Sequence, residues 1–431
     1  MVCGNSDHMT LHVDRRTLIR NAGALFGGHA AGLVVPLLTV PYLARVLRPE
    51  GFAPLLIAQA FAAWLVLFLE FGFDLSGTRA VARARAAPQQ LPDVVRGVQS
   101  AKLLLVPLAC AVFAIALAAL PSLRMDGRLL WSALAYALFR GLSPFWYFQG
   151  IERVRGAVAV ETATKALAAL GCFVVVRAPA DGWRVVALQA AFAAISLVAL
   201  TGRMLALVPM RRLSFGLAIA SLRDSTHIFA FRASAGLYVQ ANTLILSALA
   251  TAPTVAFFGG AERLIRAAIN LLQPLTQAFF PRVSFLTAAN PAMARRTVER
   301  SLVGVGGFGA LLGIGAAVGA PLFVHLLLGP GYEAAIPVLR ALAPLPLLTA
   351  LGTVLGLYWA VPFGHERALL AVVLTAGFVN IGLSIVFVPL YGALGMAASV
   401  VAAEAFVTIA LAFLYVRHRA TAAVNAAPAT A

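Results

Sequence analysis

The chain has 431 residues, of which 61% are hydrophobic and only 11% are charged, and its formal net charge is +17. Soluble domains carry about 25% charged residues, so this composition excludes a soluble protein and indicates a surface that largely contacts an apolar solvent. The net charge does not require a nucleic-acid partner, because membrane proteins place Lys and Arg against anionic headgroups. The cysteines Cys3, Cys110 and Cys172 show neither a disulfide nor a metal-ligand spacing.

Apolar runs of about 20 to 25 residues, each long enough to cross a bilayer, recur along the chain with short connections between them. The predicted spans are 22–47, 52–73, 101–120, 128–149, 156–176, 184–202, 226–250, 254–280, 301–328, 335–361, 367–388 and 392–416. We therefore predict an all-α polytopic membrane protein with about 12 transmembrane helices in two six-helix lobes. The predicted parts are an N-terminal tail (1–20), an N-terminal lobe (21–202), an inter-lobe linker (203–223), a C-terminal lobe (224–416) and a C-terminal tail (417–431).

The basic residues outside the spans predict the orientation in the membrane. Most of them lie in the N-terminal tail and in the connections that every second crossing returns to the side of that tail. We assign Lys102 to this group. Because Lys and Arg are enriched in cytoplasmic connections, both tails are predicted to be cytoplasmic. The aromatic run 145–148 is predicted to lie at the headgroup layer, where amphipathic rings are favoured.

One helix face of the span 254–280 is polar. At about 100° per residue, its polar side chains fall within an arc of roughly 100°. They are Glu262, Arg263, Arg266, Asn270, Gln273 and Gln277. Arg232 and Gln240 likewise share one arc of the preceding span. A soluble core helix would show the same pattern, but the composition excludes it, so we expect both stripes to face a water-filled interior.

Other charged side chains also lie within or at the ends of the predicted spans. The basic ones are Arg140, Lys165, Arg232, Arg263, Arg266 and Arg340, and the acidic ones are Glu70, Asp74, Glu161, Glu262 and Glu404. At about 3 kcal/mol for each charge, this set facing lipid would cost roughly 30 kcal/mol, more than the stability of a typical protein. Most must therefore face one another or water. The spacing of four residues predicts the pairs Glu161–Lys165 and Glu262–Arg266.

A cavity lined by guanidinium groups favours phosphate or carboxylate, because Arg stays charged and presents forked donors to such oxygens. Neighbouring amide side chains suit sugar hydroxyls. We therefore predict a central cationic cavity that transports an amphipathic anion, without catalytic residues or a metal site. The predicted substrate-binding residues are Arg266, Arg263, Arg232, Arg140, Lys165, Asn270, Gln273 and Gln240.

Five segments in a characteristic order carry a resemblance to a known family. They are PLLTVPYLARVLRPEGF (36–52), EFGFDLSGTRAVA (70–82), SPFWYFQGIER (143–153), GGAERL with QPLTQAFFPRVS (259–284) and LGPGYEAAIPVLRAL (328–342). The chain resembles the bacterial polysaccharide flippases, or O-antigen and exopolysaccharide translocases, of the superfamily that includes multidrug and toxin extruders. The resemblance covers about residues 21–415. Arg48 departs from it, because the family usually has Gly in this turn.

The resemblance implies a flippase of the bacterial inner membrane for polysaccharide biosynthesis. Its expected substrate is an undecaprenyl-diphosphate-linked oligosaccharide, moved from the cytoplasmic to the periplasmic leaflet by alternating access, and its expected partners are the phospholipid bilayer and a polysaccharide polymerase or export protein. No cofactor is expected beyond a coupling H+ or Na+. The candidates for ion coupling are Glu404, Glu70, Asp74, Glu161 and Glu262. Glu404 has no Lys or Arg within one helical turn and is therefore preferred.

Two other functions are compatible with parts of this pattern. A multidrug extruder of the same superfamily would handle cationic drugs, for which an Arg-lined cavity has the wrong charge. A membrane polysaccharide polymerase, ligase or glycosyltransferase would usually need a large outer loop with catalytic groups. The predicted outer connections at 121–127, 177–183 and 329–334 are only a few residues long.

Overall fold

The computed structural model describes residues 15–119, 123, 126–208 and 212–426; the side chains of residues 15–34 and of a few other helical residues, among them Gln240, lie outside the description. The elements in chain order are α1 (Arg15–Glu70), α2 (Phe73–Ala84), η1 (Pro88–Gln90), α3 (Leu91–Ala119), α4 (Gly127–Gly141), α5 (Phe145–Gly150), α6 (Val154–Val175), η3 (Pro179–Asp181), α7 (Gly182–Leu207), α8 (Phe215–Gln240), α9 (Asn242–Leu249), α10 (Ala252–Asn270), α11 (Gln273–Ala289), α12 (Pro291–Val318), α13 (Ala320–Phe323), η4 (Val324–Leu328), α14 (Ala335–Leu342), α15 (Leu345–Thr353), η5 (Val354–Ala360), α16 (Glu366–Tyr391) and α17 (Ala393–Ala426). These ranges contain helices and connections but no strand.

The helices confirm the predicted all-α membrane fold. Each predicted span is matched by one helix or by a run of two or three consecutive helical elements, and α1 contains the first span and most of the second. Eight of the described segments are individually long and apolar enough to cross a membrane. The predicted linker is partly helical, because α7 extends to Leu207 and α8 begins at Phe215.

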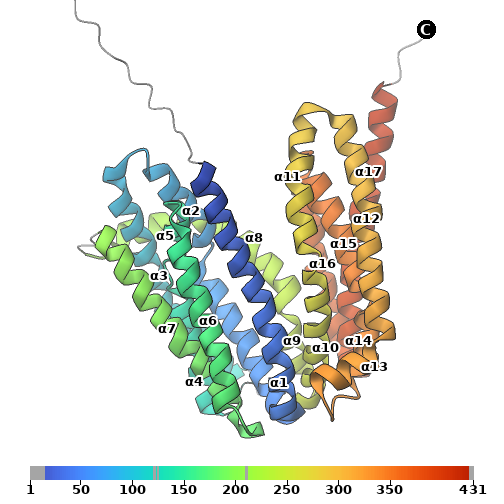
Figure 1. Ribbon diagram of the computed structural model, residues 1–431, viewed down its shortest axis with the longest axis horizontal. Helices are drawn as coiled ribbons and strands as arrows, with labels where there is room; N and C mark the ends of the chain where they lie inside the picture. Colours follow the sequence, from blue (N-terminus) through green and yellow to red (C-terminus); the bar gives the residue numbers. More distant parts are fainter. Residues whose placement is uncertain (1–14, 120–122, 124–125, 209–211, 427–431) are drawn as a thin grey trace, which may run out of the picture.

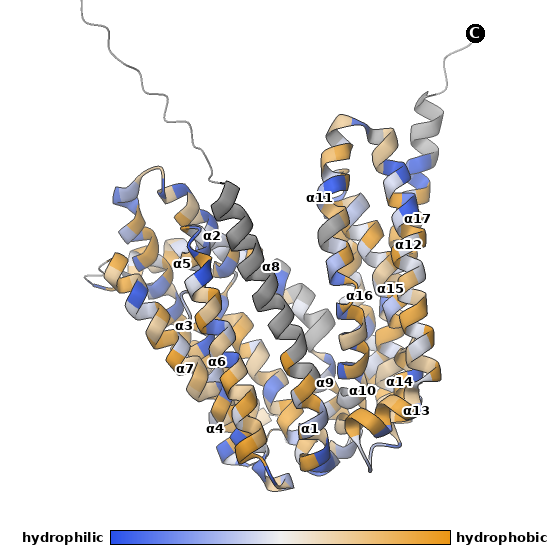
Figure 2. Ribbon diagram, viewed as in Figure 1, coloured by the Kyte–Doolittle hydropathy of each residue, from blue (hydrophilic) through white to orange (hydrophobic). Residues whose placement is uncertain are grey.

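The helices form two groups, one with α1 to α8 and one with α10 to α17 (Figure 1). The first turns of α1 and the last turns of α17 lie at the same end of the molecule, as an even number of crossings requires (Figure 1). Hydrophobic residues are frequent along the helices of both groups (Figure 2). Val303 is 77% exposed and Val198 is 72% exposed, which suits contact with lipid tails rather than water.

The α1 helix forms much of the buried core, because its second half packs against both groups. It contacts α4, α6 and α7 of the first group and α10 of the second. Small side chains permit this close packing: Ala53, Ala58 and Ala62 are fully buried. A Cβ atom added at Gly259 of α10 would lie only 2.5 Å from the Leu56 side chain. Such small residues are typical of helix interfaces in membranes, where close van der Waals contact replaces the hydrophobic effect.

The two groups meet at the end of the molecule opposite the termini, which we call the closed end. Tyr332, in the connection after η4, is fully buried and makes edge contacts with Phe52 of α1 and Phe257 of α10, each with ring centroids 6.2 Å apart. Arg45 donates a hydrogen bond to the Leu326 carbonyl. The backbone N–H groups of Glu333 and Gly331 hold the pKa of the exposed Glu333 carboxyl below its usual range. These contacts hold the connection after η4 between the two helix groups.

The aromatic run 145–148 does not form the predicted headgroup belt. Trp146 and Tyr147 are each only 2% exposed, in the short helix α5 that follows a break after α4. Trp146 lies against α2, where a Cβ atom added at Gly77 would approach its ring to 2.9 Å. The prediction was wrong because the break turns the rings toward a neighbouring helix instead of toward lipid.

The turn between the first two spans has a backbone conformation that favours glycine. Arg48 has φ 54° and ψ 174°, a region that L-residues rarely adopt and that costs about 1–3 kcal/mol. We predict that Arg48→Gly raises the free energy of unfolding by about 1 kcal/mol because it removes this strain. The midpoint of thermal unfolding in detergent measures the effect, with Arg48→Ala as the control. Equal stability of the Gly and Ala variants would contradict the prediction.

Candidate functional site

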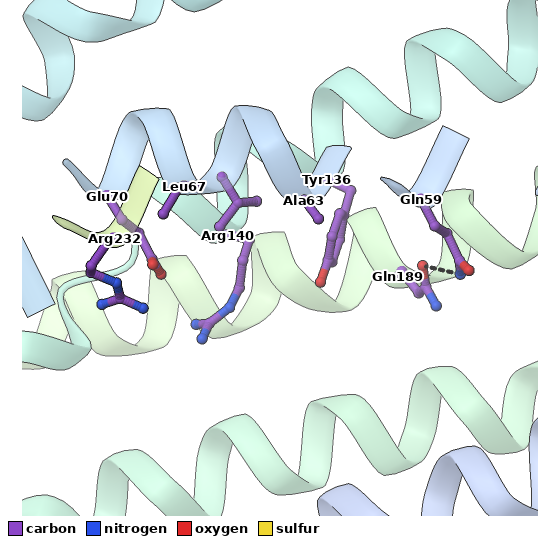
Figure 3. Close-up of a pocket in the computed structure, with 9 residues that line it drawn as sticks. Gln59, Ala63, Leu67, Glu70, Tyr136, Arg140, Gln189 and Arg232 are labelled. Atoms are coloured by element: carbon purple, nitrogen blue, oxygen red, sulfur yellow. Dashed lines mark hydrogen bonds between the residues drawn. The ribbon is translucent and has the colours of Figure 1, made fainter. Parts of the chain in front are cut away.

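A cavity of about 340 Å³ lies between α1, α4, α7 and α8. Its lining residues are Gln59, Ala63, Val66, Leu67, Glu70, Tyr136, Arg140, Gln189 and Arg232. The residues from α1 recur every three or four positions, so one face of this helix follows the cavity along its length. Figure 3 shows Glu70 and Arg232 toward one end, Gln59 and Gln189 at the other, and Arg140 and Tyr136 between them. The cavity therefore has a charged part and an amide part.

A second cavity of about 160 Å³ adjoins the first. The two cavities share Tyr136, Arg140 and Gln189. The second is completed by polar and apolar side chains of α4, of the connection after α4, of α6 and of α7. These are Phe139, Ser143, Glu161, Thr164, Lys165, Ala168, Phe192, Ala193 and Ser196. Arg140 thus stands where the two cavities meet, and either cavity can present a ligand to its guanidinium group.

Arg140 and Lys165 share one carboxylate. The Nη1 atom of Arg140 lies 2.5 Å from Oε1 of Glu161, and Nζ of Lys165 lies 3.2 Å from Oε2 of the same residue. The predicted Glu161–Lys165 pair is confirmed. Because two cations share one anion, these three side chains together keep a net positive charge, which attracts an anionic ligand.

Lys102 is buried beside this cluster and not placed among the headgroups as predicted. Its side chain is only 2% exposed, and its ammonium group donates hydrogen bonds to the carbonyls of Gly141 (2.8 Å) and Ser143 (3.0 Å). These carbonyls lie at the C-terminal end of α4, where backbone acceptors lack helical partners and a cation is favoured. This lysine does not contact headgroups because it satisfies a helix end inside the bundle. It holds the turn that carries Arg140.

At the end of the larger cavity opposite Gln59 and Gln189, Arg232 of α8 forms an ion pair with Asp74 in the first turn of α2. Both side chains are about one-third exposed. Glu70 lines the same part of the cavity. This ion pair joins α8 to α2 within the first helix group, and it neutralises a predicted coupling acid.

The α10 helix places its two predicted arginines in different surroundings. Arg266 binds Glu262 through Nε at 3.0 Å and Nη2 at 2.6 Å, which confirms the predicted pair. Arg263 donates from Nη2 to Oε1 of Gln59 at 2.6 Å and lies over the Phe52 ring, 5.3 Å from its centroid. Gln59 in turn donates to Oε1 of Gln189 at 3.2 Å.

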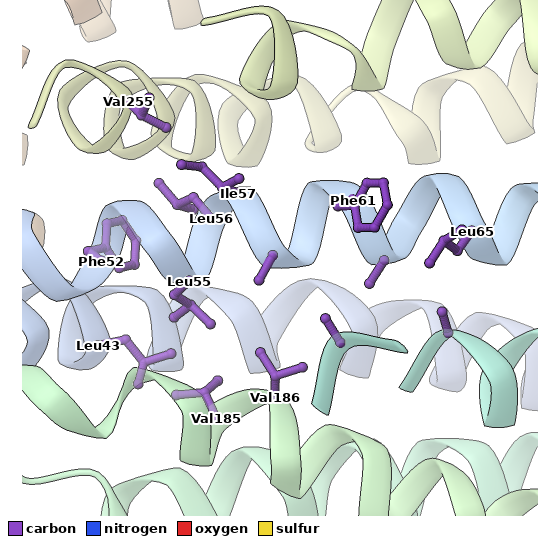
Figure 4. Close-up of a cluster of buried hydrophobic side chains, with 14 of the residues drawn as sticks. Leu43, Phe52, Leu55, Leu56, Ile57, Phe61, Leu65, Val185, Val186 and Val255 are labelled. Carbon is purple, nitrogen blue, oxygen red and sulfur yellow. The ribbon is translucent and has the colours of Figure 1, made fainter. Parts of the chain in front are cut away.

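This contact lies within the buried packing of α1 against its neighbours. Figure 4 shows the cluster of buried side chains to which Phe52, Leu56 and Ile57 of α1 belong, with Val255 of α10 on one side and Val185 and Val186 of α7 on the other. The Arg263–Gln59–Gln189 chain therefore runs from the second helix group, across α1, to the amide end of the cavity.

The remaining predicted binding residues do not line these two cavities. Asn270 is half-buried on α10, and Gln273 is exposed at the start of α11. The side chain of Gln240 lies outside the described residues. Sequence reasoning missed Gln59, Tyr136, Gln189 and Lys102. Tyr136 carried a usable signal, because it lies four residues before Arg140 and so shares its helix face.

Among the predicted coupling acids, Glu404 has distinct surroundings. Its carboxylate accepts a hydrogen bond from Thr349 of α15 at 3.1 Å. Within the ranges that the structure covers, no Lys or Arg forms an ion pair with it, whereas Asp74, Glu161 and Glu262 each have a basic partner. Glu70 likewise forms no ion pair in these ranges, but it lines the larger cavity together with Arg140 and Arg232. In the same ranges, no group of three or more His, Cys, Asp and Glu side chains could hold a metal ion.

The chain is similar to proteins of a known family. The family model described as "Polysaccharide biosynthesis protein" matches residues 18–287. The chain belongs to this family. A curated relative, provisionally assigned as an O-antigen transporter of Escherichia coli (strain K12), is 26% identical over 418 residues, which cover 95% of this chain and 99% of the relative. The sequence resemblance is confirmed, and so is the expectation of a multi-pass membrane transporter rather than an enzyme.

Two solved structures share the fold. An inward-facing multidrug resistance MATE family transporter of the MOP superfamily has a TM-score of 0.67 at 16% identity, covering 92% of this chain and 96% of its own. The lipid II flippase MurJ, in an inward closed conformation, has a TM-score of 0.70 at 12% identity, covering 92% of this chain and 87% of its own.

Proposed function

We propose that this member of the polysaccharide biosynthesis family is a flippase for undecaprenyl-diphosphate-linked oligosaccharides. The observation that carries the proposal is the position of Arg140, which lines both cavities. Its ion-pair cluster contains two basic side chains, Arg140 and Lys165, and one acidic side chain, Glu161. A diphosphate offers several oxygens to forked guanidinium donors, and a lipid-linked substrate would explain a binding region enclosed by membrane helices.

The larger cavity suggests how such a headgroup would lie. The diphosphate would bind at the charged part, near Arg140 and Arg232, while sugar hydroxyls would contact Tyr136, Gln59 and Gln189. Amide and phenol groups both donate and accept hydrogen bonds, as hydroxyls require. Arg263 and Arg266 of α10 would meet the headgroup from the second helix group. The polyprenyl tail would stay in the bilayer, because it is entirely apolar.

The two lobes would alternate between inward-facing and outward-facing states. The described conformation has contacts at the closed end, through Phe52 and Tyr332, while the two helix groups diverge toward the end that holds the termini (Figure 1). With both tails in the cytoplasm of a bacterium and the chain in its inner membrane, this is the inward-facing state. The oligosaccharide would then be released in the periplasmic leaflet, where a polysaccharide polymerase or export protein would use it.

For ion coupling we propose Glu404, with H+ as the ion. It lacks the basic partner that Asp74, Glu161 and Glu262 have in the described ranges, and its hydrogen bond from Thr349 persists whether or not a proton is bound to the other oxygen. A glutamate without a cationic partner inside a membrane bundle is suited to bind and release a proton during a transport cycle. Na+ would require additional oxygen ligands around this carboxylate.

We predict that Glu404→Gln flattens the dependence of transport on pH, because glutamine keeps the hydrogen bond from Thr349 but binds no proton. The measurement is the initial rate of flipping in proteoliposomes between pH 5.5 and 8.5. Glu366→Gln, at the exposed start of α16, is the matched control and should keep the original profile. A Glu404→Gln profile that matches that of the unmodified protein would remove Glu404 from this role.

The experiment that tests the function itself is translocation in proteoliposomes. A fluorescent undecaprenyl-diphosphate oligosaccharide is incorporated, and a membrane-impermeant quencher reports the leaflet that holds it. Flipping by the protein, above the rate in protein-free liposomes, is expected. A preparation that leaves the lipid in place but expels a cationic dye would instead identify a drug extruder.

A further inference from the structure

The chain of hydrogen bonds from Arg263 through Gln59 to Gln189 connects the contact between the two helix groups with the wall of the larger cavity. The proposed transport cycle needs to coordinate these two features. Arg263 belongs to the second helix group and donates across the interface to Gln59 of the first group at 2.6 Å. Gln59 and Gln189 both line the larger cavity and are joined at 3.2 Å. The contact between the groups therefore shares a side chain with the wall of the binding cavity.

The same arginine is part of the closed end. Its guanidinium group lies over Phe52, and the edge of Phe52 contacts the fully buried Tyr332 between the two groups. A hydrogen bond from a charged donor is about twice as strong as a neutral one, so Gln59 is an important partner for holding Arg263 in this position. Loss of the Gln59 acceptor would weaken the contact between the groups beside Tyr332.

We propose that Gln59 and Gln189 are a sugar-sensing switch for the closed end. This inference rests on the proposed function, since the ligand is the oligosaccharide headgroup in the cavity. Sugar hydroxyls that bind the two amides compete with Arg263 for Oε1 of Gln59. A loaded cavity releases Arg263 and allows the closed end to open, whereas an empty cavity keeps it shut. The diphosphate alone occupies the charged part and leaves the amides paired.

The position of Gln59 explains how a bound sugar would affect the contact between the two helix groups. Each amide has two N–H donors and one acceptor oxygen with two lone pairs, and Arg263 donates to one lone pair of the Gln59 oxygen. A hydroxyl that donates to the other lone pair shares the oxygen's electron density with Arg263 and therefore weakens the inter-lobe bond. Gln189 holds the Gln59 amide in the orientation that presents its oxygen to Arg263.

The test measures the distance across the closed end with spin labels. Glu50 of α1 and Ala334 of the connection after η4 are both exposed, and a Cβ atom added at the neighbouring Gly331 would lie 3.8 Å from Pro49. The full chain, with Cys3, Cys110 and Cys172 replaced by Ser, carries Glu50→Cys and Ala334→Cys. Pulsed electron paramagnetic resonance in nanodiscs then reports the short and long distance populations.

Without ligand, the parent should show mainly the short distance. Loss of a hydrogen bond from a charged donor shifts a two-state equilibrium by about tenfold or more, so Gln59→Leu should raise the ratio of long to short distances by about this factor. Gln59→Glu keeps the acceptor and adds charge, so it should shift the ratio in the opposite direction. Opposite shifts cannot result from misfolding alone. Gln99→Leu, at a buried glutamine of α3, should leave the ratio unchanged.

The ligand arm uses undecaprenyl-diphosphate oligosaccharide and, separately, undecaprenyl diphosphate. The first should raise the long-distance population of the parent and have less effect on Gln59→Leu, and the second should leave the parent near its ligand-free ratio. Equal ratios for the parent, Gln59→Leu and Gln59→Glu without ligand would overturn the switch, whatever the protein transports. Equal responses to the two lipids would overturn sugar sensing. Failure of the proposed function is distinguishable, because it would appear as absent flipping by the parent in proteoliposomes.

Discussion

Arg140→Ala is expected to reduce flipping of an undecaprenyl-diphosphate oligosaccharide by about 10- to 100-fold, because each lost hydrogen bond from a charged donor contributes about 1.5–3 kcal/mol. Arg140 lines both cavities, so its removal withdraws a forked donor from the region where the diphosphate would bind. The measurement is the initial rate of flipping at matched protein incorporation.

A second variant separates recognition of the ligand from stability. Arg140→Ala leaves Glu161 with Lys165 alone, and because Arg140 is 27% exposed we expect a loss of only about 1–3 kcal/mol, less than for a fully buried pair. The double variant Arg140→Gln/Glu161→Gln removes both charges and should recover most of this stability without recovering transport. If the double variant flips the substrate at the original rate, Arg140 only neutralises Glu161 and does not bind the headgroup.

Lys102→Met is expected to lower the free energy of unfolding by about 2–4 kcal/mol, because it leaves the carbonyls of Gly141 and Ser143 without their charged donor. Methionine has a similar length, so the change leaves little empty volume. Flipping should also slow, because the last turn of α4 no longer holds Arg140 in place. The measurements are the midpoint of thermal unfolding and the initial rate of flipping.

Leu103→Met is the matched control for this change, because Leu103 is the next residue on α3 and is 43% exposed at the surface. It should alter neither quantity. A Lys102→Met protein as stable as the parent would contradict the account, because it would mean that the two carbonyl bonds merely compensate for the cost of burying the ammonium group.

The sequence predicted the spans well because apolar length is a local property of the chain. It also predicted the Glu161–Lys165 and Glu262–Arg266 pairs, since a spacing of four residues places two side chains on one helix face whatever the tertiary structure. These features depend on one helix at a time. They are therefore accessible without knowing how the helices pack.

The contacts between helices could not be predicted in this way. The Arg140–Glu161 ion pair joins α4 to α6, and the Arg263–Gln59 bond joins the two helix groups. Both depend on helix rotation and register, which periodicity does not give. Gln59 and Gln189 were missed because single uncharged amides in apolar runs carry little signal beside charged residues. The burial of Lys102 was missed because a lysine near a span boundary is equally compatible with a headgroup contact and with a buried helix cap.

The central claim is that basic side chains in this membrane bundle recognise the diphosphate of a lipid-linked oligosaccharide. The most direct test compares the flipping of one labelled oligosaccharide attached to undecaprenyl diphosphate with that of the same oligosaccharide attached to undecaprenol. The proteins are the unmodified chain, Arg266→Ala on α10 and, as a control, Arg340→Ala on the exposed face of α14. We predict that the unmodified protein and Arg340→Ala flip only the diphosphate lipid, and that Arg266→Ala flips it much more slowly. Equal flipping of both lipids by all three proteins would contradict the claim.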